Sequence, residues 1–162
     1  MTLGGKRFAA LPASAILELV LEGFLNDAPR GVSRLMMIRN LLVAPLGLRT
    51  SPLGCPVSSL LSENRSNLFA GQYPVLDQSV DDASGSAQVL LGANDKHLIF
   101  RSCVSVEKIE GGAVRLTLGT VVLCKNLFGR FYMAAISQVH RRYISPAMLR
   151  RAADYARLKV FS

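Results

Sequence analysis

The sequence is poor in the residues that build disulfide frameworks and many metal sites. It has 162 residues, with no tryptophan, two histidines and three cysteines. Cys55, Cys103 and Cys124 are odd in number and far apart, which argues against a disulfide framework and leaves no CxxC metal or redox pair. This cysteine usage favours a reducing, cytoplasmic compartment. Half of the residues are hydrophobic and 19% are charged, a composition typical of one folded domain over residues 1–162.

Long apolar runs are also absent. No run approaches the roughly 20 residues needed to cross a bilayer, because Pro45 and Gly47 interrupt one apolar stretch and charged residues interrupt the others. Near the N-terminus, Pro12, Glu18 and Glu22 break the continuous apolar region that a secretory signal peptide requires. We therefore expect a soluble protein of the cell interior.

The common catalytic signatures are missing too. The sequence has no GxSxG nucleophile elbow, no phosphate loop with GK[ST], no HExxH zinc motif and no cluster of His and Cys ligands. We therefore predict no cofactor and no metal site. The sequence by itself names neither a reaction nor a substrate.

Hydrophobic periodicity predicts an α+β fold. After an extended start over residues 6–11, a helix is expected over residues 14–25, with Ser14 as its N-cap. A second short helix is expected over residues 32–43. Residues 49–71 are rich in Pro, Gly, Ser and Asn and predict an irregular loop, which is either an insert, our preferred interpretation, or a lid.

Alternating residues then predict an antiparallel sheet. It starts at residues 73–76, continues over 87–91 and 97–108, and turns at Gly111-Gly112 into a last strand over 114–124. In the last two strands, one face is largely apolar and should face the core: Leu98, Phe100, Ser102, Val104, Val106, Val114, Leu116, Leu118, Thr120, Val122 and Cys124.

A basic amphipathic helix follows the sheet. Pro146, after Ser145, should either kink this helix or restart it. Residues 125–162 hold eight Lys or Arg against one acid, Asp154, and so carry most of the net charge of +8. The apolar residues recur at helical spacing and predict a buried stripe: Phe128, Phe131, Tyr132, Ala135, Ile136, Val139, Tyr143, Ala147 and Met148.

The charge asymmetry can mark an anionic partner, although a basic run opposite an apolar stripe is usually a solvated face. Stacking on nucleic-acid bases needs exposed aromatic side chains among the basic residues. Because the aromatic residues of this helix are expected on its buried side, we predict no nucleic-acid partner. A transient contact with an anionic membrane surface is the more coherent functional interpretation.

Three parts of the chain, within about residues 35–152, resemble the family known as domain of unknown function 2867. The matching residues are Arg39–Val43 with Pro45–Leu48, then Leu91-Gly92, Asp95, His97-Leu98 and Phe100-Arg101, then Asn126-Leu127, Gly129-Arg130, Tyr132, His140-Arg141 and Met148–Arg151. That family resembles the helix-grip superfamily of START domains, birch-pollen-allergen-like proteins and polyketide cyclases. The resemblance implies a curved antiparallel sheet wrapped around a long C-terminal helix, with an apolar cavity between them.

Five residues are candidates for binding a ligand in such a cavity: Phe100, Ser102, Thr120, Tyr132 and His140. Ser102 and Thr120 are polar exceptions on apolar faces, and His140 lies at the edge of the helical stripe. We expect a small hydrophobic or lipid-like ligand. Two alternatives stay open, namely a cyclase or hydrolase with His140 and Tyr132 as acid or base, and a homodimeric interaction module.

The other histidine, His97, shares one face of its strand with Arg101. The pair would suit an anion only if that face were concave, whereas the alternation places it outside. An ion pair between Arg101 and Glu107 or another nearby carboxylate is the ordinary expectation.

Overall fold

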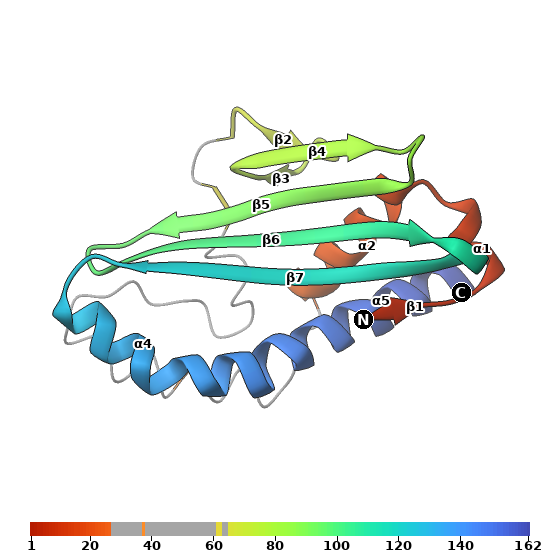
Figure 1. The fold of residues 1–162 in the computed structure, drawn as a ribbon. Helices are drawn as coiled ribbons and strands as arrows, with labels where there is room; N and C mark the ends of the chain where they lie inside the picture. The colour runs from red at the N-terminus through yellow and green to blue at the C-terminus, as the bar shows by residue number, and fades with distance from the viewer. Residues whose placement is uncertain (27–36, 38–60, 63–64) are drawn as a thin grey trace.

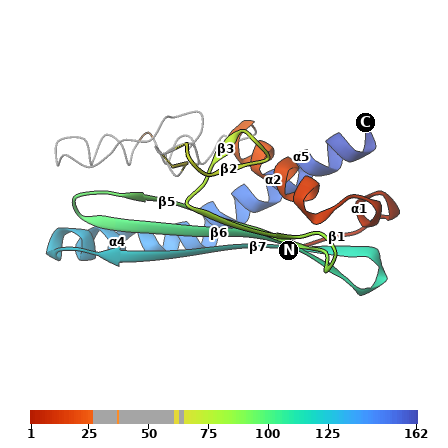
Figure 2. The ribbon, with the colours of Figure 1, turned by 90° about the horizontal axis from the view of Figure 1, so that it is seen from above.

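The structure is a computed structural model that describes residues 1–26, 37, 61–62 and 65–162. Its main feature is a sheet with helices on one face (Figures 1 and 2). The strands are β1 (Thr2–Leu3), β2 (Leu68–Phe69), β3 (Tyr73–Pro74), β4 (Asp77–Asp81), β5 (Ser86–Asn94), β6 (Leu98–Ile109) and β7 (Ala113–Cys124). The helical segments are α1 (Lys6–Ala10), α2 (Ala13–Asn26), η3 (Glu110–Gly112), α4 (Leu127–Val139), η4 (His140–Ile144) and α5 (Ser145–Phe161).

The α+β fold class is confirmed, with an antiparallel sheet, short N-terminal helices and a long C-terminal helix. The main sheet has five strands in the order β1-β7-β6-β5-β4. Gly111 and Gly112 close the predicted β6–β7 hairpin at positive φ, a conformation that glycine adopts without strain. Except for Met37, the predicted helix over 32–43 lies outside the described residues, as do residues 49–60 and 63–64 of the predicted loop.

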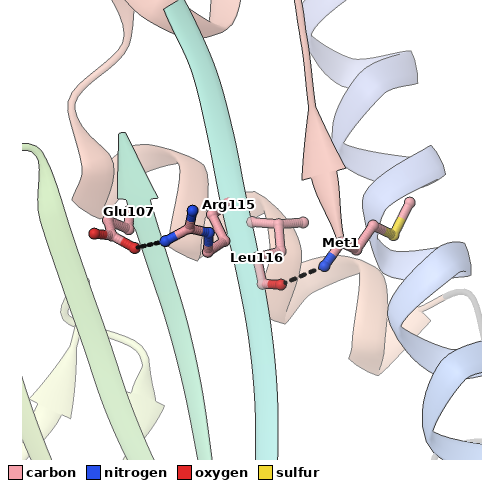
Figure 3. A network of polar contacts seen from close by, with 4 residues as sticks. All are labelled: Met1, Glu107, Arg115 and Leu116. Atoms are coloured by element: carbon pink, nitrogen blue, oxygen red, sulfur yellow. Dashed lines mark hydrogen bonds and ion pairs between the residues drawn. The ribbon is translucent and has the colours of Figure 1, made fainter. Parts of the chain in front are cut away.

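The two outer strands were not predicted as part of this sheet. β4 pairs with β5, whereas Tyr73–Pro74, expected to start the sheet, instead pairs with β2 in a separate two-stranded ribbon. At the other edge, β1 pairs with β7, and the Met1 amine donates a hydrogen bond to the Leu116 carbonyl over 3.0 Å (Figure 3). Beside it, Arg115 on β7 forms an ion pair with Glu107 on β6 at 3.0 Å (Figure 3).

The start of the chain is helical where an extended segment was expected. Residues 6–10 form α1, because the buried Phe8 anchors this turn and its ring meets that of Phe161 edge-on, with centroids 6.0 Å apart.

The cap of α2 also differs from the prediction. The Asp82 carboxylate, from the β4–β5 turn, accepts hydrogen bonds from the Ser14 N–H (2.9 Å) and hydroxyl (2.7 Å). These bonds lower the pKa of Asp82.

The core lies between the sheet and α2, and α5 packs against α2 beside it (Figure 2). Small residues let the two helices approach closely. A Cβ atom built on Gly23 would lie 2.8 Å from the Ala152 Cα atom. The Tyr155 hydroxyl donates a hydrogen bond to Glu22 over 2.7 Å. The second half of the C-terminal helix is therefore fixed by α2 at one end of the molecule.

The first half of this helix corrects the predicted buried stripe. Within α4, Gly129 is the buried residue, whereas Phe131 is 74% exposed and Tyr143 in η4 is 66% exposed. Helical spacing predicted the long helix correctly. It did not indicate that α2 covers the other end of the sheet, so that the exposed side of α4 has no described neighbour to bury it.

The change at Pro146 is one of helix type, because α5 begins at Ser145 with Pro146 in its first turn. The backbone stays in the right-handed helical region at Ile144 and Ser145, and a π-helical turn over His140–Ile144 precedes the proline. A proline inside an α-helix lacks an N–H and crowds the carbonyl four residues before it. The wider π turn accommodates both effects, and the ribbon changes direction between α4 and α5 without an interruption (Figure 1).

Candidate functional site

A cavity of about 760 Å³ lies between the half of the sheet that α2 leaves open and the C-terminal helix. This volume is within the range of pockets for small ligands, and the cavity is partly open to solvent. Its walls come from β6, β7, α4, η4 and α5. The described residues that line it are Met1, Phe100, Leu118, Thr120, Val122, Met133, Ile136, Ser137, His140, Arg141, Ser145, Pro146, Leu149 and Arg150.

The sheet side of the cavity is mainly apolar. Phe100 of β6 and Leu118 and Val122 of β7 continue the inward-facing alternation beyond the buried core. Thr120 lies between them, directly opposite Ser102 on the neighbouring strand. Their hydroxyl groups share a hydrogen bond of 3.0 Å, so the buried Ser102 is satisfied and holds Thr120 in place.

The helix side begins with the apolar residues Met133 and Ile136, one turn apart. Then the π turn brings His140 and Ser145 together, with Nδ1 of the imidazole 3.0 Å from the serine hydroxyl oxygen. The Ser145 N–H also donates to the His140 carbonyl, a bond that spans five residues. Burial lowers the pKa of His140. The ring is therefore mainly neutral at pH 7, a form that can accept a hydrogen bond or a proton.

The structure places the five predicted site residues at different depths. Phe100, Thr120 and His140 line the cavity, and Ser102 lies beside Thr120 on the neighbouring strand. Tyr132 is half-buried but does not belong to the described lining. Whether any of the five binds a ligand stays a prediction.

Sequence reasoning missed Ser145, Arg141 and Arg150 as lining residues. Ser145 escaped notice because its contact with His140 requires the π turn, for which the nearby Pro146 was the available signal. The arginines were assigned to a solvated basic face, and both side chains are indeed largely exposed while bordering the cavity.

His97 and Arg101 do not form an anion site together. Arg101 donates a hydrogen bond to its neighbouring Phe100 carbonyl over 2.7 Å, and the expected partner Glu107 pairs with Arg115 instead. That expectation was wrong because the register places Glu107 opposite Arg115 on β7. A long arginine side chain can satisfy its donors on backbone carbonyls without any acid.

The junction between β7 and α4 uses His97 in another way. Asn126 caps α4, since its side-chain oxygen accepts a hydrogen bond from the Gly129 N–H over 2.9 Å. The Asn126 amide nitrogen lies 2.6 Å from Nδ1 of His97, and the His97 ring meets Phe128 edge-on. This cluster directs the helix as it leaves the sheet and so positions the helical wall of the cavity.

The described residues contain no group of three or more His, Cys, Asp and Glu side chains placed to hold a metal ion. Among the helices of the described part, none is long and apolar enough to cross a membrane.

Comparisons with curated proteins and with solved structures give no match. A family model described as a protein of unknown function (DUF2867) matches residues 7–148, which include the β7–α4 junction and most of the cavity lining. The chain therefore belongs to the DUF2867 family of proteins of unknown function.

Proposed function

We propose that this protein is a cytoplasmic binding protein for a small hydrophobic or lipid-like molecule. The observation that carries the proposal is the cavity of about 760 Å³ with apolar residues on both its sheet and helix walls. Each methylene group that a ligand buries there contributes roughly 0.8 kcal/mol. The sheet-and-helix arrangement also supports a relation to helix-grip proteins, and the free thiols of Cys103 and Cys124 are compatible with a reducing compartment.

Native mass spectrometry combined with organic extraction tests this proposal. We expect a copurifying apolar molecule at one per chain, or, after its removal, one-to-one binding of added dodecanol. An empty protein that also fails to bind dodecanol at concentrations below its solubility limit would contradict the proposal. Ribonuclease A or another compact protein without an apolar cavity serves as the reference for non-specific adducts.

The cyclase or hydrolase alternative uses the same cavity, and one observation favours it. His140 is neutral at pH 7 and bonded to the Ser145 hydroxyl, an arrangement in which the imidazole can take up a proton. The extraction distinguishes the two functions. A ligand recovered unchanged after prolonged incubation supports binding, whereas a product that disappears with His140→Ala supports an enzyme. Tyr132, the other expected acid or base, is not in the described lining.

We further propose that α4 and η4 rest on an anionic membrane surface while the ligand enters or leaves. The exposed stripe consists of Leu127, Phe131, Val139 and Tyr143, which recur at intervals of four or eight residues and so form a stripe that winds around the helix. Basic side chains in the same segment provide the charge complement to anionic lipid: Arg130, Arg141 and Arg142. Aromatic residues with flanking arginines suit the headgroup region of a bilayer.

Replacing one exposed residue tests the membrane contact. We expect Phe131→Ser to weaken binding to phosphatidylserine-containing vesicles by about tenfold in a sedimentation assay, because a large apolar side chain contributes roughly 1.5 kcal/mol or more on burial. Leu158→Ser is the matched control, since Leu158 is 71% exposed but lies in α5 outside the stripe. It should leave vesicle binding unchanged.

Two other partners would give different results in the same experiment. If the Phe131→Ser variant loses affinity for single-stranded RNA but not for vesicles, the exposed aromatics stack on bases instead. The sequence-based argument against nucleic acid relied on burial of these aromatics, which the structure does not bear out. A dimer that light scattering detects and that Phe131→Ser dissociates would assign the stripe to a second copy of the chain.

A further inference from the structure

Two arginines border the cavity. Arg141 comes from η4 and Arg150 from α5. The described lining contains no aspartate or glutamate. Within the described part of the chain, the arginines that form ion pairs are Arg115 and Arg157, and neither of them borders the cavity. A guanidinium group is always charged at physiological pH and carries five N–H donors. The cavity therefore has a positive border whose donors are available to a ligand.

Apolar residues occur on both walls of the described lining, but its charged side chains lie only on the helix wall. The sheet wall is apolar at Phe100, Leu118 and Val122. Most of the polar lining lies on the helix, and its charged members are the two arginines. His140, which is mainly neutral at pH 7 because burial lowers its pKa, offers hydrogen bonds to this wall but no charge. A purely apolar ligand would use the sheet wall and leave the arginines without a role, whereas an amphipathic anion complements both walls.

We propose that the ligand carries a carboxylate or phosphate monoester head group, which Arg141 and Arg150 bind while its apolar body lies against the β6–β7 wall. This inference rests on the proposed binding function and names its ligand class. Hydrogen bonds between guanidinium groups and oxyanions are charge-assisted and frequently bidentate. Both arginines are largely exposed, so solvent screens part of this attraction.

Calorimetric titration with three probes of equal chain length tests the inference. Dodecanol is used below its solubility limit, and dodecanoate and dodecyl phosphate are used below their critical micelle concentrations. We expect the two anions to bind about tenfold more tightly than the alcohol. The free energy that corresponds to this factor lies between the contribution of an exposed ion pair and that of a hydrogen bond to a buried charged group. Raising the salt concentration from about 0.02 M to 0.5 M should weaken the binding of the anions but not that of dodecanol. The relative affinity of the two anions separates a fatty-acid-like ligand from a phosphate ester.

The arginines are then tested with matched variants. The double variant Arg141→Gln/Arg150→Gln should bind all three probes with the affinity of dodecanol, and Arg141→Lys/Arg150→Lys should keep part of the preference for anions. The control is Arg157→Gln/Lys159→Gln, which removes the same charge from exposed residues of α5 outside the described lining. Thermal unfolding verifies that all variants are folded.

The outcomes separate this inference from the proposed function. If dodecanol binds as tightly as the anions, or if Arg141→Gln/Arg150→Gln leaves anion affinity unchanged, the head-group assignment is wrong and the apolar cavity stands. If none of the three probes binds, the cavity proposal itself fails and the head-group assignment fails with it. An equal loss in the control variant would assign the effect to net charge and would also overturn the role of Arg141 and Arg150.

Discussion

Replacing Gly129 by alanine is expected to lower the free energy of unfolding by about 2 kcal/mol. The added Cβ atom would lie 2.5 Å from the His97 carbonyl oxygen and 3.3 Å from its carbon. Backbone atoms cannot yield as a flexible side chain does, so the cost falls near the upper end of the roughly 1 to 3 kcal/mol that overpacking causes. The better helix propensity of alanine offsets about 1 kcal/mol of it.

Gly119→Ala is the matched control. An added Cβ atom at Gly119, an exposed residue of β7, meets nothing within 4 Å. Alanine there should leave stability unchanged or raise it by roughly 0.5 kcal/mol, because it restricts the unfolded chain. Urea and thermal unfolding measure both variants, with a decrease in Tm of about 4 to 8 °C expected for Gly129→Ala. Equal stabilities of the two variants would show that α4 moves freely at this junction.

The Gly129 experiment also bears on the cavity. Asn126 and Gly129 fix the first turn of α4 against the end of the sheet, while Gly23 and Ala152 fix α5 against α2. Between these two anchors the helix runs beside the open half of the sheet. Among the described residues, the cavity thus depends on close packing at both ends of one helix.

Local periodicity predicted the central strands well. Leu98, Ser102, Val104 and Val106 are buried as the alternation of β6 indicated, and the Gly111-Gly112 turn closes the hairpin. The direction of a side chain in a strand can be predicted from its position in the sequence, because successive residues point to opposite faces of the sheet. The edge strand β4 gave no such signal, since four of its five residues are exposed and none is buried.

Contacts between distant segments account for the errors. Spacing predicted the apolar stripe of the C-terminal helix, but burial of Phe131 would need a partner, and α2 lies elsewhere. The Asp82 carboxylate that caps α2 is 68 residues from Ser14 in the chain. For the site, alternation identified Phe100 and Thr120, whereas the contact of His140 with Ser145 depends on a π turn that no hydrophobic pattern encodes.

Introducing tryptophan at Ser137 is expected to abolish ligand binding. Ser137 is a small, half-buried residue of α4 that lines the cavity, so an indole ring there occupies the space of the apolar ligand. If the indole ring prevents only two methylene groups of the ligand from being buried, the binding free energy weakens by roughly 1.6 kcal/mol. This loss alone lowers the affinity by more than about tenfold. Titration with dodecanol or with the copurified ligand measures the loss. Stability should be unchanged or higher, since the ring fills a void rather than enlarging one.

The neighbouring residue Gln138 provides the matched control, because it is exposed and outside the described lining. Gln138→Trp introduces the same side chain one position along the same helix and should leave ligand affinity unchanged. The natural sequence has no tryptophan, so each variant contains a single indole whose fluorescence reports its surroundings. We expect a blue-shifted emission at position 137 that added ligand does not alter, and a water-like emission at position 138. If Ser137→Trp retains full affinity, the ligand lies elsewhere, and the cavity between sheet and helix is not the binding site.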